Sequence, residues 1–423
     1  MVYVLNKNGK PLMPTKRHGK AGRLLKDGMA KVARLEPFTI QLLYDSAEYT
    51  RPISLGVDAG SKTIGISATT EKEELYAAEV KLRTDIVDLL STRRAFRSAR
   101  RNRKTRYRKP RFNNRVRSKH KGWLAPSIEN KIQTHIKTVV NIHKILPITK
   151  IVVEVASFDI QKIKNPGISG KDCRQGDQMG FWNAREYVLF RDGHACHGRK
   201  GCKNPILNVH HIESRKVGGD APNNLIALCE DCHSDYHAGK LKLNLKRGQS
   251  FRDAAFMGIM RWAFYNRLKE KHPDAGMTYG YITKSTRIRN GLEKDHAVDA
   301  RCISGNPKSI PLDAIYMQKA VRKRNRQIHK ATINKGGKRK LNQSPKYAFG
   351  FQLFGRVQMP DGRKGFIFGR RSSGSFDVRK LDGAKLSAGT GRKKLKPLEK
   401  RKTILTERSM RLHSAIPPSV IAK

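Results

Sequence analysis

The chain has 423 residues, with 88 Lys and Arg against 35 Asp and Glu, which gives a formal net charge of +53. Such an excess destabilises a compact protein by self-repulsion unless a polyanion neutralises it, so the expected partner is a nucleic acid. No run is apolar and long enough to span a bilayer, and no basic amphipathic helix has the broad apolar face of a membrane-surface protein. The length predicts several domains.

The expected compartment is a reducing cytoplasm. The first residues lack the apolar core of a signal peptide. Of the 6 cysteines, four belong to one motif described below, and the other two, Cys173 and Cys302, are expected to be reduced.

The first two segments carry short strands. Within residues 1–50, alternating apolar residues predict strands near Val2–Leu5, Ala30–Arg34 and Phe38–Tyr44, in a small basic α+β unit. Residues 53–69 then form two short β runs joined at a Gly-rich turn.

An aspartate, Asp58, ends the first of these two runs, and glycines follow it. Glycine leaves space for a phosphate and a metal close to the backbone. A turn aspartate beside glycines is also common without any function, so this segment alone leaves both interpretations open.

Residues 84–122 are the most basic part of the chain, and a helix is expected from Thr84 to about Arg103. Arginines lie on nearly every side of that helix, so it does not belong to a core. Binding to phosphates is the favoured interpretation, with base stacking on Tyr107 and Phe112, and a solvated charge run is the alternative. The arginines expected to contact RNA are Arg93, Arg94, Arg97, Arg100, Arg101, Arg103, Arg106 and Arg108.

Apolar residues at helical spacing predict a helix with one buried face between 126 and 146. The next run, Lys150–Ala156, predicts a buried strand that carries one acid, Glu154. A glutamate among Ile and Val is costly to bury unless it binds a cation.

Two cysteine pairs, Cys196/Cys202 and Cys229/Cys232, bracket a tandem histidine. Four thiolates suit a tetrahedral structural zinc site. A zinc ribbon that binds nucleic acid without cutting it is the alternative, although a bare ribbon does not need the further polar residues of this motif together. Those residues are His210, His211, Asn224, His233 and His237.

Three elements are expected after this motif: a helix at Phe251–Lys271, a strand at Thr278–Lys284 and a helix at Leu292–Ala300. On the last of these, His296 and Asp299 are three residues apart and share a face.

The acids Asp58 and Glu154, together with His296 and Asp299, make a dispersed set on separate elements. Two-metal catalysis uses such a set, because carboxylates then bridge two cations that activate water and stabilise the leaving oxygen. Asp295 either adds a ligand or only lies beside the site.

Residues from about 306 onward are basic again. Lys319–Lys340 suggests a flexible or RNA-bound arm, and short apolar runs between 348 and 378 predict strands of a small β-barrel. Beyond Lys393 no compact pattern is evident, so another arm is expected there.

The segments around Asp58, Glu154 and 295–299 resemble the three motifs of RuvC-type RNase H-like nucleases. The Cys/His motif resembles the HNH nuclease module, in which a β-hairpin and a helix hold one divalent metal. That second resemblance implies His211 as the general base and His210 and His233 as metal ligands, with His237 a possible substitute. It also implies that Asn224 orients the loop that carries the base.

The order of these motifs, with Pro11-Leu12-Met13-Pro14 near the start, resembles IscB, a family of transposon-encoded, RNA-guided DNA endonucleases related to the type II CRISPR effector. The implied fold is α+β multidomain: an RNase H-like (RuvC) α/β core split in three, an inserted arginine-rich bridge helix, an inserted zinc-bearing ββα HNH module and a small basic β-barrel-like C-terminal domain. The expected boundaries are 1–50 (PLMP), 51–83 (RuvC-I), 84–122 (bridge helix and linker), 123–180 (RuvC-II), 181–240 (HNH), 241–305 (RuvC-III) and 306–423 (C-terminal domain).

The family also implies the reaction and the partners. A long structured guide RNA (omega RNA) pairs with one strand of double-stranded DNA, HNH cuts that strand, RuvC cuts the displaced strand, and the C-terminal domain interacts with RNA and reads a target-adjacent motif. Two Mg²⁺ at RuvC, one Mg²⁺ at HNH and a structural Zn²⁺ are expected, in a monomeric ribonucleoprotein of the prokaryotic cytoplasm. The alternatives are a guide-free homing-type or junction endonuclease and a non-cutting RNA-binding regulator.

Overall fold

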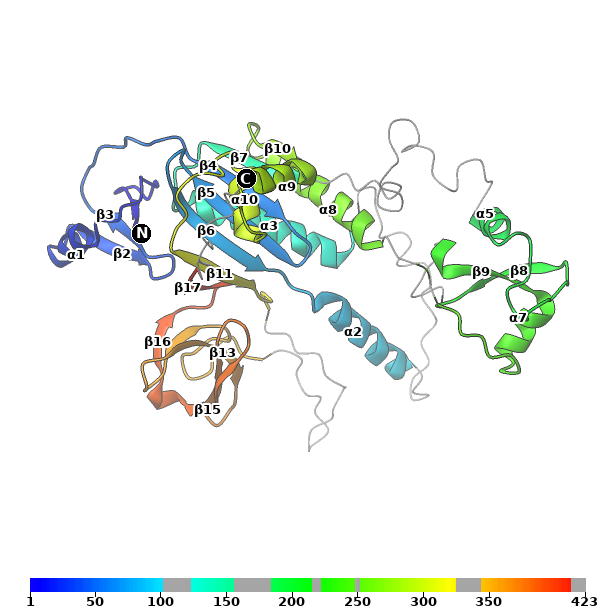
Figure 1. Ribbon diagram of the computed structural model, residues 1–423. Helices are drawn as coiled ribbons and strands as arrows, with labels where there is room; N and C mark the ends of the chain where they lie inside the picture. Colours follow the sequence, from blue (N-terminus) through cyan, green and yellow to red (C-terminus); the bar gives the residue numbers. More distant parts are fainter. Residues whose placement is uncertain are drawn as a thin grey trace, which may run out of the picture. The chain divides into compact units, whose positions relative to one another are not determined.

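The computed structural model describes residues 1–101, 123–155, 184–214, 222–246, 248, 252–324 and 344–411. The chain divides into two compact units, which are described separately (Figure 1). The core unit comprises Met1–Ala156 and Met260–Lys423, and the inserted unit comprises Ser157–Ile259.

A seven-stranded mixed sheet forms the centre of the core unit, in the order β10-β7-β4-β5-β6-β11-β17 (Figure 1). Its strands β10, β7 and β4 are parallel, β5 is antiparallel to both β4 and β6, and β11 is parallel to β6. Side chains of β4 and β5 are buried on both faces, which explains their nearly continuous apolar runs. The strands are β4 (Ser54–Ala59), β5 (Thr63–Thr69), β6 (Glu74–Lys81), β7 (Lys150–Val155), β10 (Gly276–Tyr279), β11 (Ala314–Ala320) and β17 (Ile404–Met410).

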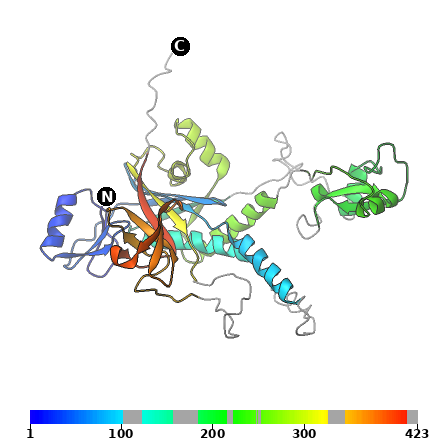
Figure 2. The same cartoon turned by 90° about the horizontal axis from the view of Figure 1, so that it is seen from below.

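Helices cover this sheet on both sides (Figure 2). On one side, α3 (Pro126–His143) buries the apolar stripe that its helical spacing predicts, including Ile132 and Val139. On the other side lies α10 (His296–Ile303), which packs against β4 and β5 with Ala297 fully buried. A mixed α/β multidomain architecture, as expected from the motifs, is therefore confirmed.

The contact between α10 and the sheet is a backbone contact that requires glycine. An added Cβ at Gly56 would lie 1.9 Å from the carbonyl oxygen of Ala300, and one at Gly65 would lie 1.9 Å from that of His296. The space beside Gly65 is thus filled by α10, whereas the sequence suggested room there for a phosphate. These two glycines let His296 and Asp299 approach the end of β4.

Replacing Gly65 with Ala is expected to push α10 away from the sheet and to lower the free energy of unfolding of the core unit by about 1–3 kcal/mol, because the backbone of α10 cannot yield as a side chain would. Denaturant unfolding followed by circular dichroism measures this cost. The matched control is Gly22→Ala in α1 (His18–Lys26), where an added Cβ meets nothing within 4 Å. That change is expected to stabilise the helix slightly, and equal costs at the two glycines would contradict the packing argument.

The strand predicted at Thr278–Lys284 is wrong over most of its length. Only β10 (Gly276–Tyr279) is a strand, and α9 (Gly280–Arg289) follows at once. The parallel pairing of β10 with β7 ends at the Tyr279–Val155 pair. Beyond that pair the chain turns away from the sheet edge, so the aromatic and β-branched residues that suggested a strand become helical.

A three-stranded sheet with the order β1-β3-β2 forms the N-terminal module. The helix α1 also belongs to this module, in line with the α+β unit predicted for residues 1–50. The module is fastened to the central sheet by Tyr3, whose hydroxyl donates to the carbonyl of Leu75 at 2.9 Å. Its strands are β1 (Tyr3–Leu5), β2 (Ala30–Arg34) and β3 (Thr39–Leu42).

A five-stranded antiparallel sheet, β15-β14-β13-β12-β16, lies between β11 and β17 in the chain. The prediction of an arm beyond Lys393 is wrong for β16 and β17, because β16 pairs with β12 and β17 pairs along its length with β11. This pairing stabilises β17, whose sequence alone shows only a weak strand pattern. Closure of the five strands into a barrel stays a prediction. The strands are β12 (Arg356–Gln358), β13 (Lys364–Arg370), β14 (Ser375–Arg379), β15 (Lys385–Gly391) and β16 (Lys396–Glu399).

In the inserted unit, a two-stranded antiparallel sheet is followed directly by a helix. The strands are β8 (Leu207–His211) and β9 (Leu225–Cys229), and the helix is α7 (Glu230–His237). One further helix, α5 (Ala184–Arg191), packs on this hairpin through the fully buried Val188. The described residues include two further α-helices, α2 (Ile86–Arg101) in the core unit and α8 (Arg252–Lys269), whose residues from Met260 onward belong to the core unit.

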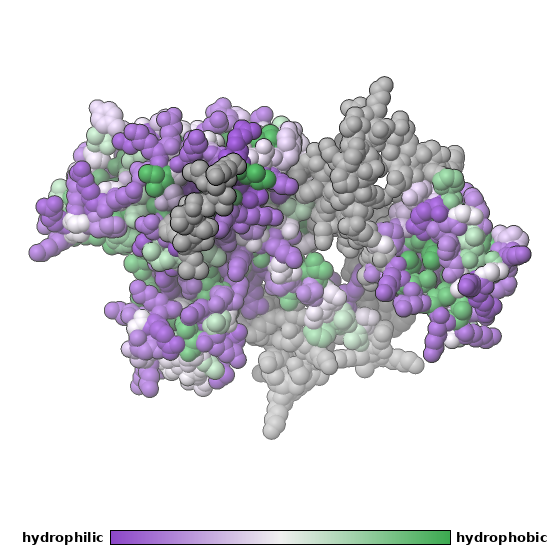
Figure 3. Space-filling view, in the orientation of Figure 1, coloured by the Kyte–Doolittle hydropathy of each residue, from purple (hydrophilic) through white to green (hydrophobic). Residues whose placement is uncertain are grey.

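The visible surface of both units is mostly hydrophilic (Figure 3), as the net charge of +53 requires. In the part of the chain that the structure describes, no helix combines the length and apolarity needed to cross a membrane.

Candidate active sites

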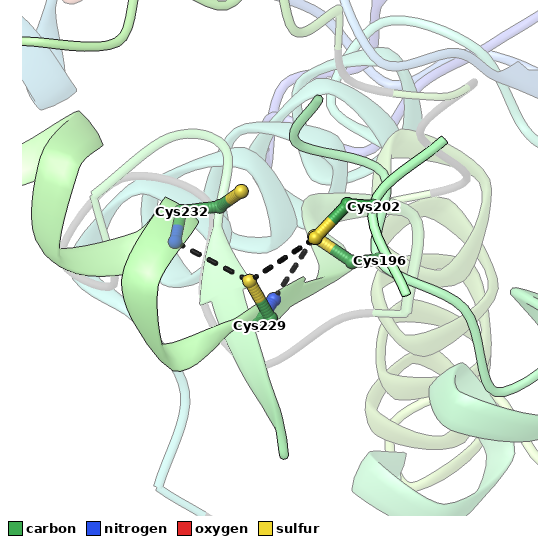
Figure 4. Close-up of side chains that lie close together, drawn as sticks. All are labelled: Cys196, Cys202, Cys229 and Cys232. Atoms are coloured by element: carbon green, nitrogen blue, oxygen red, sulfur yellow. Dashed lines mark hydrogen bonds between the residues drawn. The ribbon is translucent and has the colours of Figure 1, made fainter. Parts of the chain in front are cut away.

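Four cysteines converge at the end of the β8–β9 hairpin (Figure 4). Their sulfur atoms all lie within 4.8 Å of one another, and those of Cys202 and Cys229 are 3.6 Å apart. Gly198 is needed here, because an added Cβ would lie 2.7 Å from the sulfur of Cys232. Cys196 and Cys202 lie in the segment between α5 and β8, Cys229 ends β9, and Cys232 lies in the first turn of α7, so these elements together bring the two pairs to one place.

This cluster has the donor chemistry of a structural zinc site. A zinc–sulfur distance of about 2.3 Å in a tetrahedron places sulfurs about 3.8 Å apart, close to the observed spacing. Burial raises the pKa of the Cys196 thiol, but the backbone N–H groups of Cys229 and Gly198 donate to its sulfur and bring the pKa down to about 7. Those donors favour the thiolate, which is the form that binds a metal.

A second cluster joins β8 to α7. Ring nitrogens of His210, His233 and His237 lie within 4.8 Å of one another. The sequence offered His233 and His237 as alternatives, whereas the structure brings both beside His210. Burial, followed by repulsion from the other histidines, lowers the pKa of His210 to about 4. Burial also lowers the pKa of His233. The imidazoles of His210 and His233 are therefore neutral near pH 7 and able to bind a cation.

Next to this cluster on β8, His211 is half-buried. The cluster found among the described residues consists of His210, His233 and His237 and does not include His211. The fully buried amide of Asn224 holds the segment that follows it: the side-chain oxygen accepts the N–H of Glu213 at 2.8 Å, and the side-chain nitrogen donates to the Glu213 carbonyl at 3.0 Å. Asn224 therefore fixes the chain two residues beyond His211.

Replacing Asn224 with Ala is expected to leave both backbone groups of Glu213 unsatisfied and to destabilise the inserted unit by about 1–3 kcal/mol. The same change is expected to slow any cut that depends on His211, because the loop after it loses its anchor. Thermal unfolding and single-strand cleavage rates measure the two effects. Asn223→Ala is the control, since that amide donates a longer bond, 3.3 Å, to the carbonyl of Gly248 and does not bond to Glu213 in the contacts that anchor this loop. An equal loss there would contradict the anchoring role.

The dispersed acidic set lies around the carboxyl ends of two neighbouring strands of the central sheet. Asp58 lies on β4, Glu154 on the adjacent β7, and His296 and Asp299 on α10. Nδ1 of His296 donates to Oδ2 of Asp58 at 2.7 Å. The charge of Asp58 also acts on Glu154 and Asp299.

Two arginines that sequence reasoning missed complete this site. Arg261 on α8 places one nitrogen 3.1 Å from Oε1 of Glu154 and another 3.9 Å from Oδ1 of Asp58. Arg287 on α9 places its Nε 3.0 Å from Oδ1 of Asp299. No local pattern marks either residue in so basic a chain, because each meets its partner only through tertiary packing.

Burial and neighbouring charges shift the pKa values of the residues in this site. Burial raises the pKa of Glu154, while the charge of Arg261 opposes that rise. Burial also raises the pKa of Asp299, followed by repulsion from Asp58. The hydrogen bond to Asp58 raises the pKa of His296. Carboxylate oxygens are the ligands that Mg²⁺ prefers. Among the described residues, however, only the cysteine and histidine clusters bring three or more ligand atoms within 4.8 Å of one another, so the acidic set suits Mg²⁺ by its chemistry and not by a formed cluster.

The role of Asp295, left open by the sequence, is that of a helix cap. Its side chain accepts the N–H groups of Ala297 at 2.8 Å and Val298 at 3.2 Å, at the start of α10. A capping carboxylate satisfies backbone donors that the first helical turn leaves unpaired. Asp295 thereby fixes the end of α10 that carries His296.

Part of the expected arginine surface lies on α2. Arg94 and Arg97 are exposed there and Arg93 is half-buried. The side chains of Arg100 and Arg101 lie outside the described residues, as do Arg103, Arg106 and Arg108 together with Tyr107 and Phe112.

Comparison with known proteins identifies two regions. Residues 2–176 match the family described as RRXRR protein, and residues 195–239 match the HNH endonuclease family. Anaredoxin from Nostoc sp. (strain PCC 7120) is 40% identical over 45 residues, which are 10% of this chain and 59% of that protein. The type II-C Cas9 enzyme from Actinomyces naeslundii aligns at 12% identity over 60% of each chain with a TM-score of 0.24, a likeness on which no argument rests. The chain thus spans less than two thirds of either relative.

Residues 195–239 are accordingly an HNH endonuclease domain, a class of metal-dependent DNA nuclease, and they contain both the cysteine and the histidine clusters. RRXRR is the bridge-helix motif of IscB and Cas9. The succession of an RRXRR region and an HNH endonuclease domain confirms the resemblance to the IscB family that the motifs predict.

Proposed function

We propose that this protein is an RNA-guided DNA endonuclease with two active sites, one in each unit. The observation that carries the proposal is the presence of two separate constellations suited to divalent cations. One is the histidine cluster of the inserted unit, and the other is the acidic set at the edge of the central sheet. Two nuclease sites in one chain suit cleavage of both strands of a duplex.

In the HNH site, His211 is proposed to accept a proton from the attacking water. His210 and His233 would hold one Mg²⁺, with His237 beside them as a further ligand. A divalent cation supplies charge neutralisation at the scissile phosphate and at the leaving oxygen. Asn224 keeps the loop after the base in place. The strand cut here is proposed to be the one paired with the guide.

In the RuvC-like site, Asp58, Glu154, His296 and Asp299 are proposed to hold two Mg²⁺ and to cut the displaced strand. The carboxylates would supply the negative charge that such ions need, and each of them is paired with arginine or histidine in this partly buried site. The four cysteines would hold Zn²⁺ and take no part in the chemistry.

Recognition of the target is proposed to be delegated to base pairing with a long structured guide RNA (omega RNA), in a monomeric ribonucleoprotein. The net charge of +53 supports a long contact path along nucleic acid, and the exposed arginines Arg94 and Arg97 on α2 are candidate RNA contacts. Residues 306–423, with the five-stranded sheet, are proposed to read a target-adjacent motif. The other domain boundaries are proposed to be those predicted from the sequence, with 1–50 as the PLMP domain, 51–83 as RuvC-I, 84–122 as the bridge helix and linker, 123–180 as RuvC-II, 181–240 as HNH and 241–305 as RuvC-III.

The test is to express the chain with its flanking genomic DNA, purify it and sequence the bound RNA. A discrete long RNA that maps beside the gene, and that directs Mg²⁺-dependent cleavage of matching DNA, is the expected result. Cleavage of a fixed site by RNA-free protein would instead indicate a guide-free endonuclease. RNA binding without any cleavage in Mg²⁺ would indicate a regulator.

A further inference from the structure

Arg261 is a buried cation placed between two acids of the RuvC-like site. Its side chain is 9% exposed. Its Nε donates to the carbonyl oxygen of Ala59, one residue beyond Asp58, at 2.7 Å. Its two terminal nitrogens face Glu154 at 3.1 Å and Asp58 at 3.9 Å. One guanidinium therefore spans neighbouring strands at the point where both acids lie.

A divalent cation and this guanidinium compete for the same oxygens. Mg²⁺ bound to both acids would lie about 2.1 Å from an oxygen of each. The oxygens that face Arg261 are Oε1 of Glu154 and Oδ1 of Asp58, while Oδ2 of Asp58 is taken by His296. A metal that bound Oε1 of Glu154 and Oδ1 of Asp58 would therefore require the terminal nitrogens of Arg261 to leave these two oxygens.

We propose that Arg261 is a built-in counter-ion that holds the Asp58–Glu154 pair together in the metal-free protein and gives way when a divalent cation binds. This inference rests on the proposed function, because it assumes that the acidic set is a metal site. Arg261 is a positioning residue in this role. The bond from Nε to the Ala59 carbonyl holds the side chain beside the site.

Removal of the counter-ion has opposite consequences with and without metal. Without metal, Asp58 and Glu154, which are both buried, would repel each other, and breaking a buried ion pair by removing one partner is strongly destabilising. With metal, the divalent cation would no longer have to displace the guanidinium of Arg261, so the divalent cation would bind more tightly. A merely structural arginine would not couple its loss to metal affinity in this direction.

The experiment uses the full chain with His233→Ala and His237→Ala, so that the histidine cluster does not contribute to binding. Mn²⁺ affinity is measured by electron paramagnetic resonance, and thermal unfolding is followed in EDTA and in saturating Mn²⁺. Arg261→Met keeps an unbranched side chain of similar length. The matched control is Arg267→Met on the same helix, since Arg267 pairs with Glu129 at 2.7 Å and does not contact the site acids.

In Arg261→Met, Mn²⁺ is expected to bind at least about tenfold more tightly than in the parent. Its midpoint of unfolding is expected to fall in EDTA and to be restored by Mn²⁺, while Arg267→Met leaves Mn²⁺ affinity unchanged. Unchanged or weaker affinity in Arg261→Met overturns the inference, and so does a loss of folding that Mn²⁺ does not restore.

Asp58→Asn in the same background separates this inference from the proposed function. If the parent and Asp58→Asn bind Mn²⁺ alike, the acidic set is not a metal site and the proposed RuvC chemistry fails. If the two differ while Arg261→Met matches the parent, the metal site stands and only the role of Arg261 is refuted.

Discussion

Asp58→Asn is expected to turn an enzyme that cuts both DNA strands into one that nicks only the guide-paired strand. Asparagine keeps the size of the side chain but removes the charge at the centre of the acidic set, where Asp58 meets both His296 and Arg261. Loss of several kcal/mol of metal-mediated transition-state stabilisation corresponds to a fall of about 10³-fold or more in the rate of the RuvC cut. The HNH cut is expected to keep its rate, because its residues lie in the other unit.

Separate end-labels on the two strands of a target duplex measure both rates in one reaction. Asp45→Asn is the matched control, since this carboxylate is exposed and only pairs with Lys7 at 3.5 Å on the surface. His211→Ala should show the converse pattern, with the displaced strand still cut. Loss of both cuts in Asp58→Asn, while RNA and DNA binding stay normal, would contradict the assignment of two independent sites.

Cys232→Ser is expected to abolish zinc binding and to unfold the HNH domain. Cys232 is 1% exposed, and its sulfur lies within 4.8 Å of the other three. Structural zinc contributes on the order of 10 kcal/mol to a small domain, which is comparable with or larger than the whole stability of such a domain. Because α7 begins beside Cys232 and carries both His233 and His237, the histidine cluster would be lost with it.

Zinc content by atomic spectroscopy, limited proteolysis and strand-specific cleavage together measure this outcome. The HNH cut should disappear and the RuvC cut should remain. Cys302→Ala is the matched control, because Cys302 is also buried but lies on α10 in the core unit. A zinc-free variant with an intact HNH cut would show that the cysteine cluster does not support the domain.

Elements with strong local patterns were predictable. The apolar run of β4 and the helical stripe of α3 occur where expected, because burial on both faces gives a strand a continuous apolar run and burial of one face gives a helix a period of 3.6 residues. The bounds of β10 and the turn into α9 were predicted wrongly, since they depend on where β7 ends. The strand β17 was missed because its partner β11 lies about 90 residues earlier in the chain and no local signal reports a pairing.

The sequence by itself determined the ligand types of the HNH domain. Cys229 and Cys232 lie three residues apart, and His233 and His237 lie four apart on one helix, so short-range geometry alone brings each pair together. Only the tertiary structure decided which residues surround the acidic set. Arg261 is 202 residues from Ala59 along the chain yet bonds to it, because the order of strands in the sheet, and not any local spacing, sets which distant residues meet.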